Sequence, residues 1–165
     1  ATIPRWAASS SSAALPASGT MQLTYLPADK TQPVSTVYLR TGTTAAAATP
    51  TLCRIGLFSV AANGDLTLIA STVNDTTLFA ATSTNYSKAF SAAAGITAGD
   101  RLALGILVIS GAALPTFAGA GAPGSSETAV GPRSAGQVSG LSDLPSTVAN
   151  ASISANNAHI YARVA

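Results

Sequence analysis

Two apolar runs joined by a short polar turn constrain the fold of this chain more than any other feature. Thr51 to Val60 is apolar on both faces, Leu66 to Val73 follows, and Ala61-Ala62-Asn63-Gly64-Asp65 lies between them. Asn-Gly supplies the positive φ angles that tight hairpin turns require, and each run has the length of a strand rather than of a helix. The pattern predicts an antiparallel hairpin over 51–73, with 51–60 as an interior strand.

Strand-length patterns on both sides extend this hairpin into a sheet. Thr20 to Leu26 predicts one strand, and Val34 to Thr41 predicts another, with Val37 and Leu39 sharing one face. A short strand is expected over Asn85 to Phe90, before a turn over 95–100. Together these segments predict a sheet protein rather than a helical one.

The most apolar segment, Arg101 to Ser110, does not alternate. It therefore predicts a central strand buried on both faces, and Gly105 in its middle indicates close approach of another backbone or a large side chain. At the other end of the chain, His159 to Val164 alternates again, with Ile160, Ala162 and Val164 on one face, and predicts a final strand.

The remaining segments are expected to connect these strands. Thr76 to Thr82 predicts one helical turn plugged by Leu78 and Phe79, and the Gly/Pro/Ser/Ala-rich stretch from Gly111 to Thr147 predicts long ordered loops. Short strands are expected there near Leu114 to Phe117 and Gln137 to Ser139. Roughly seven to nine strands with turn-rich connections predict an all-β, antiparallel β-sandwich that is jelly-roll-like.

The chain divides into a short first segment and one domain. Residues 1–19 are rich in Ser and Ala, contain Pro4 and Pro16, and are expected to be a linker or N-terminal arm outside the core. Residues 20–165 are expected to form the β-sandwich domain, since 165 residues suit a single core. The chain has neither an initiating Met nor a signal-peptide pattern, so we take it as a fragment or a processed chain.

Low charge limits the kinds of function. Charged residues are 8% of the chain, against roughly 25% in typical soluble domains. The polar surface is therefore expected to be Ser, Thr, Asn and Gly, which suits packing against other subunits or contact with uncharged, hydroxyl-rich ligands. The net charge of +2 is spread over scattered basic residues, so we expect no nucleic-acid binding. The longest apolar run, 102–109, is strand length, so we expect no membrane insertion.

The sequence contains few candidate catalytic residues. The single Cys53 lies in an apolar run and His159 in a predicted strand, where it is expected to be a structural or surface residue; no Gly-x-Ser-x-Gly motif occurs. The acidic residues all fall in predicted turns or loops, where Asx-turn chemistry alone explains them: Asp29, Asp65, Asp75, Asp100, Glu127 and Asp143. We therefore expect no enzyme activity, no catalytic residues, no cofactor and no metal site.

Binding residues are better represented. Tyr38 with Arg40, and Tyr161 with Arg163, are each two residues apart on a predicted strand and so share a face. An aromatic ring beside a guanidinium suits a sugar ring and its hydroxyls, although the same pairs serve as sheet cover or a subunit interface. Trp6 either pins the N-terminal arm to its own domain or a neighbouring subunit, or offers a stacking platform to a ligand.

The middle of the chain resembles a known family. The run Thr49-Pro50-Thr51-Leu52-Cys53-Arg54-Ile55-Gly56-Leu57-Phe58-Ser59-Val60 is similar to a domain of minor tail proteins of actinobacterial bacteriophages. The similarity continues through Asn63 to Thr72, Asn74-Asp75-Thr76 and Ala98 to Gly105, and covers roughly residues 20–120. It brings no catalytic motif with it.

The resemblance implies a virion structural protein of the tail fibre or receptor-binding type, located in the phage tail and extracellular. Such a domain would attach to a host cell-surface polysaccharide or to neighbouring virion subunits, and a homotrimer is expected. Two alternatives stay open: a capsid decoration or shell protein with the same sandwich, and a carbohydrate-binding module of a secreted bacterial protein.

Overall fold

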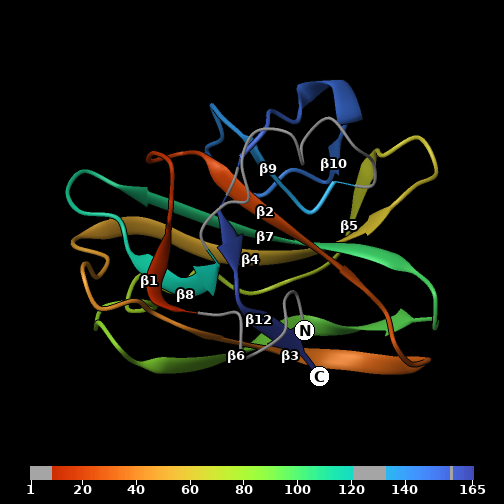
Figure 1. The fold of residues 1–165 in the computed structure, drawn as a ribbon, viewed down its shortest axis with the longest axis horizontal. Coiled ribbons are helices and arrows are strands. Elements are labelled where there is room, and N and C mark those ends of the chain that lie inside the picture. Colours follow the sequence, from red (N-terminus) through yellow and green to blue (C-terminus); the bar gives the residue numbers. More distant parts are fainter. Residues whose placement is uncertain (1–8, 121–132, 157) are drawn as a thin grey trace.

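The computed structural model describes residues 9–120, 133–156 and 158–165, and these residues form an all-β protein of packed antiparallel sheets (Figure 1). The elements in chain order are β1 Ser9–Ala14, β2 Met21–Pro27, β3 Gln32–Arg40, β4 Pro50–Val60, β5 Leu66–Ser71, β6 Asn85–Ile96, β7 Arg101–Ser110, β8 Thr116–Ala120, β9 Ala135–Val138, β10 Thr147–Val148, the 3₁₀ turn η2 Asn150–Ser152, β11 His159–Ile160 and β12 Ala162–Val164.

The first eight strands form nested antiparallel pairs. The hairpin β4–β5 is innermost, β3 pairs with β6 around it, β2 pairs with β7, and β1 pairs with β8 outermost. The pairs alternate between two sheets: β5-β4-β7-β2 lie side by side in one, while a bridge from Thr41 to Phe117 links the pairs β3–β6 and β1–β8 in the other. Nested pairing of eight strands across two sheets is the jelly-roll topology, and it confirms the predicted fold class.

The C-terminal strand completes the second sheet. β11 pairs with β8 and β12 pairs with β3, so the chain switches neighbour at Tyr161, whose N–H donates to Ala118 O at 2.9 Å. The single strand predicted over 159–164 is therefore two short strands. Alternation along the sequence could not show this switch, because the residue at the crossing still points in the expected direction.

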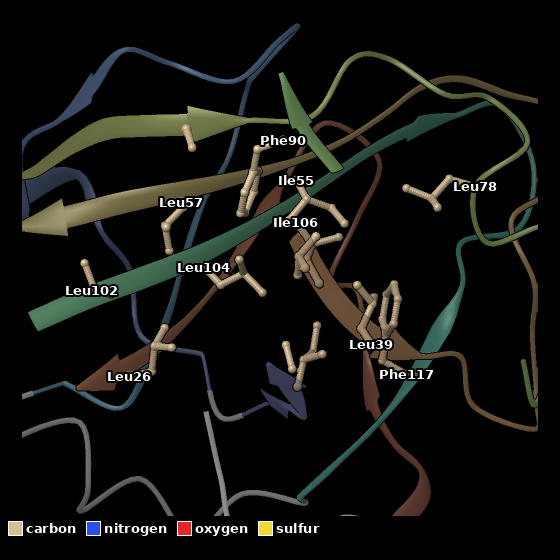
Figure 2. Packing of buried hydrophobic residues seen from close by; sticks show 14 of the residues in the cluster. Leu26, Leu39, Ile55, Leu57, Leu78, Phe90, Leu102, Leu104, Ile106 and Phe117 are labelled. Atoms are coloured by element: carbon tan, nitrogen blue, oxygen red, sulfur yellow. The ribbon is translucent and has the colours of Figure 1, made fainter. Parts of the chain in front are cut away.

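The main core lies between the two sheets. Ile55 and Leu57 of β4 and Leu104 and Ile106 of β7 face Leu39, Phe90 and Phe117 of the second sheet (Figure 2). Figure 2 also shows Leu78 at the border of this cluster, and Phe79 stacks edge-on against Phe117 at a centroid distance of 4.8 Å. Burial of these side chains, at about 25 cal/mol per Å² of apolar area, is the main stabilising term.

A second apolar cluster covers the outer face of the larger sheet. The sheet has the order β10-β5-β4-β7-β2-β9, and Met21, Phe58 and Leu107 on its outer face pack against residues of the later chain such as Val138 and Ile153. In Figure 1, the edge strands β9 and β10 of this sheet lie toward the top of the view, and β3 and β6 of the other sheet lie toward the bottom. β7 is therefore buried on both faces, as predicted, and Gly105 adjoins Met21 Sδ and Phe58 Cε2, either of which an added Cβ would meet within 3 Å.

Several local expectations need correction. Residues 9–15 are part of the fold, because β1 pairs with β8 and both Ala13 and Leu15 are buried. Residues 76–79 form a turn rather than a helical turn, since Phe79 has a φ of 67°; Leu78 and Phe79 are nevertheless buried as expected. β6 continues to Ile96, so the turn expected over 95–100 starts later.

The hairpin turn predicted at 61–65 lies where expected, but its backbone conformation differs from the prediction. Gly64 has a φ of 88°, whereas Asn63 does not adopt a positive φ. Asn63 instead holds the loop through its side chain, which donates to Asp65 Oδ2 at 2.7 Å and accepts from the Asp65 N–H at 3.1 Å. The loop is therefore longer than a two-residue turn, because Ala61 N–H bonds to Asp65 O.

Candidate functional site

Three of the predicted binding residues meet on the open face of the sheet β12-β3-β6. Arg163 of β12 pairs with Tyr38 of β3, and its Cζ lies 4.5 Å from the centroid of the Tyr38 ring. The sequence had paired Arg163 with Tyr161 on its own strand, whereas the structure pairs it with Tyr38 on the neighbouring strand. We call the surface formed by Tyr38, Arg40, Asn85, Ser87 and Arg163 the Tyr38 face.

The strand register explains this grouping. Arg40 lies opposite Asn85 of β6, and Tyr38 lies opposite Ser87. The Arg40 Nη1 donates to Asn85 Oδ1 at 2.9 Å, which links the two side chains across the neighbouring strands. The inward residues of the same strands, Val37 and Leu39, are buried, so period-two alternation places polar groups outward and the core inward.

The Tyr38 face carries positive charge without a carboxylate. Among the described residues the ion pairs are Arg54 with Asp143 and Lys88 with Asp75, so neither Arg40 nor Arg163 is neutralised by an acid there. Tyr38 is 36% exposed. A half-open phenol ring beside two guanidiniums, an amide and a hydroxyl offers one apolar surface and several hydrogen-bond donors, which suits a hydroxyl-rich ligand.

Arg163 also lines a pocket next to this face. The pocket has a volume of about 280 Å³ and lies between Leu26 and Leu102 of the larger sheet and Gln32 and Ile96 of the smaller one. The Tyr38 face and this pocket therefore share Arg163.

The other predicted binding residues contribute less. Tyr161 is half-buried at the crossing between β8 and β3, and Trp6 lies outside the described residues. Asn85 and Ser87 were missed as site residues. The alternation of Asn85, Ser87 and Ala89 with Tyr86, Lys88 and Phe90 was the available signal, because it places the small polar residues on the outward face.

Candidate catalytic residues have local structural partners. Asp75 accepts from the Thr77 N–H and from Lys88 Nζ, Asp100 from the Thr97 N–H, and Asp143 from the Leu144 N–H. The turn contacts are those expected from the sequence, whereas the ion pair of Asp75 with Lys88 was not predicted; Glu127 lies outside the described residues. His159 is buried, with Nε2 3.4 Å from Ser134 Oγ.

In the part of the chain that the structure describes, no group of three or more His, Cys, Asp or Glu side chains could hold a metal ion. Nor does that part contain a helix long and apolar enough to cross a bilayer.

Comparison with known proteins adds no family to this description. No protein-family model matches the chain, and no curated protein matches it.

Proposed function

We propose that this chain is an adhesion and assembly domain of a phage tail, and that its Tyr38 face binds a host cell-surface glycan. The observation that carries the proposal is the Tyr38–Arg163 contact, with the Arg40–Asn85 hydrogen bond beside it on the same exposed sheet. Jelly rolls serve as viral capsid domains and as lectins, but fold alone does not define function. The tail assignment rests on the sequence resemblance over residues 20–120.

The ligand class follows from the chemistry of the face. A sugar presents an apolar C–H surface to an aromatic ring and its hydroxyls to amide and guanidinium groups. The 8% charged composition leaves few competing ionic sites elsewhere. The face lies on the exposed side of a sheet, so it suits an extended polysaccharide rather than a small substrate held for chemistry.

The test is binding of the purified chain to arrays of actinobacterial cell-wall polysaccharides. Tyr38→Ala and Arg163→Gln are each expected to weaken binding about tenfold, the loss of a well-placed contact. Val73→Ala removes an exposed apolar side chain beyond the end of β5 and should leave binding unchanged. Binding that survives both Tyr38-face variants would overturn the assignment of the face.

Assembly with neighbouring subunits is the second candidate role, and the edge of β6 favours it. In the described chain β6 pairs with β3 alone. Thr36 exchanges hydrogen bonds with Ala165 on the β12 side, so by the alternation of an antiparallel ladder Val37 and Leu39 bond to Lys88 and Tyr86. The backbone groups of Asn85, Ser87 and Ala89 therefore point away from the sheet, and an open edge of this kind accepts a strand from another chain.

A proline variant separates assembly from stability. Ser87→Pro removes an N–H that points outward and leaves the β3–β6 bonds in place, so it is expected to weaken self-association without unfolding the domain. Sedimentation over a range of concentrations measures the effect, and the predicted homotrimer would appear as a mass three times that of the chain. A monomer at high concentration would contradict the trimer.

The location of the domain distinguishes a tail protein from a shell protein. A labelled antibody against the domain is expected to mark the tail tip of the virion. Labelling of the head would instead support a capsid decoration role. Cleavage of a bound polymer by the chain would contradict the expected lack of enzyme activity.

A further inference from the structure

A second, polar recess lies at the same end of β2 and β7 but on the other face of the larger sheet, around Tyr25 of β2. It has a volume of about 210 Å³ and is lined by Tyr25, Arg101, Arg133, Asn63, Gly64 and Asn150, among others. We call it the Tyr25 pocket. Its volume is below the roughly 300–1,000 Å³ of sites for drug-sized ligands, so it suits one small unit rather than a chain of them.

Neighbouring segments bring two guanidiniums to the same phenol. Tyr25 pairs with Ala103 of β7 on one side, two residues from Arg101, and its N–H donates to Ser134 O on the other, one residue from Arg133. Burial raises the pKa of the Tyr25 hydroxyl above its ordinary value, while the charges of Arg133 and Arg101 act to lower it. Both arginines also line the pocket together with Tyr25.

These two charges have no acidic partner in the described chain. The ion pairs there involve Arg54 and Lys88 instead. Arg133 donates to the carbonyl oxygen of Ile153, a neutral acceptor. The carboxylate of Asp65, on the adjoining loop, accepts from Asn63 and from the Asn150 N–H. Two uncompensated guanidiniums at one recess favour an anion.

The amide side of the pocket is held in place by the loop that follows β10. Asn150 N–H donates to Asp65 Oδ1 at 2.7 Å, and Asn150 Nδ2 donates to Asn63 O at 3.0 Å. Gly64 fits closely here, because a Cβ at this position would lie 2.8 Å from Asn150 Cγ. The hairpin tip and the later chain therefore form one rigid wall, and a ligand need not order it.

We propose that the Tyr25 pocket binds an acidic sugar unit, with its carboxylate on Arg101 and Arg133 and its ring against Tyr25. Planar guanidinium groups match the geometry of a carboxylate, and the Asn63 and Asn150 side chains provide amide groups to hydroxyls. The inference deepens the proposed glycan-binding function, since it adds a charged residue class to the polymer. It concerns a different surface from the Tyr38 face and can fail independently of it.

The experiment is an amide NMR titration of the purified chain with sodium glucuronate. Glucose at equal concentration supplies the ring without the charge, and acetate and inorganic phosphate supply charge without the ring. Glucuronate is expected to shift the amide signals of Tyr25, Gly64 and Asn150 at concentrations where the other three do not. Equal binding of glucose, acetate or phosphate would overturn the proposal, as would unshifted signals at these residues.

Two matched variants test whether the positive charge in the Tyr25 pocket binds the carboxylate. Arg101→Gln removes one guanidinium and is expected to weaken glucuronate binding about tenfold. Lys30→Gln makes the same change in net charge outside the pocket and should leave the affinity unchanged. Equal losses in both variants would show general attraction and overturn the site. Tyr38→Ala should also leave glucuronate binding intact, so a failure of the Tyr38 face and a failure of this pocket give different results.

Discussion

Arg163 and Tyr38 lie opposite each other on β12 and β3, with the guanidinium carbon 4.5 Å from the ring centroid. This contact joins the last strand of the chain to an early one, so the surface that it forms exists only in the complete sandwich. It also holds the exposed arginine side chain against the tyrosine ring. A site built on two paired strands is more rigid than one built on loops.

The energy of this contact can be measured with a double-mutant cycle. Tyr38→Ala, Arg163→Gln and the double variant are expected to show a coupling of about 0.5–1 kcal/mol, typical of an exposed cation–π pair. Urea unfolding of the four proteins gives the value. The cycle removes the separate effects of each substitution on strand stability, and additive losses would show that the contact does not stabilise the fold.

Among the glycines that the structure describes, Gly119 is expected to be the least tolerant of a side chain. It lies on β8 between β1 and β11, where an added Cβ would collide with the carbonyl oxygen of His159 and lie 2.8 Å from the Ala13 Cβ. Because backbone cannot move aside cheaply, Gly119→Ala should lower the free energy of unfolding by about 2–3 kcal/mol. Chemical denaturation measures the loss.

Gly95→Ala is the matched control for this substitution. Gly95 also lies in a strand, β6, but a Cβ there would meet nothing within 4 Å. The change should leave stability unaltered or raise it by up to about 1 kcal/mol, since alanine reduces the entropy of the unfolded chain. Equal losses at the two glycines would contradict the packing of β8 between β1 and β11.

The Asp75–Lys88 ion pair should make stability depend on acidic pH. Hydrogen bonds from Lys88 and Thr77 lower the pKa of Asp75 to about 2. Because the folded pKa lies below the unfolded one, the pair stabilises the protein above about pH 4 and loses this effect as the pH falls toward 2. Asp75→Asn should cost on the order of 1–2 kcal/mol at pH 7 and much less near pH 2.

Unfolding by urea at several pH values tests this dependence. Asp29→Asn, at an exposed turn, serves as the control and should change stability little at either pH. A constant cost of Asp75→Asn from pH 7 to pH 2 would show that the loss comes from packing or the Thr77 turn rather than from the charge.

Cys53 should be unreactive in the folded protein. The side chain is buried in the main core, and burial, with a smaller effect of the Asp75 charge, raises the pKa of the thiol to about 11. The thiolate that reacts with alkylating reagents is therefore scarce as well as inaccessible. Iodoacetamide labelling followed by mass spectrometry should be slow in buffer and fast in urea, and rapid labelling in buffer would contradict the burial.

The parts of the fold that sequence could predict are those decided by local pattern. The hairpin 51–73 follows from two apolar runs and an Asn-Gly turn, and the burial of β7 follows from the uninterrupted apolar residues of 101–110. Gly105 was correctly linked to close packing, which comes from Phe58 and Met21. Each of these features can be predicted from residues close together in the sequence.

The parts that sequence could not predict depend on distant partners. The sequence of Ser9 to Ala14 has no strand pattern of its own. The segment is a strand because its backbone pairs with the edge of β8. Residues 91–95 are small and mostly exposed, and they extend β6 because β3 runs beside them. For the binding face, alternation placed Tyr38 and Arg40 on one side, whereas the partnership with Arg163 needed the register between β3 and β12.

The insertion of the C-terminal strand between β8 and β3 has a consequence for local unfolding. Its two halves bond to different neighbours, so the release of residues 159–164 would uncover part of the edge of each neighbour at once. The exposed edges of β8 and β3 could then pair with residues 159–164 of a second copy of the chain. This exchange of a strand between copies is domain swapping. Hydrogen exchange at Arg163 and Ala165, whose N–H groups face β3, therefore reports how often the C-terminal strand is released.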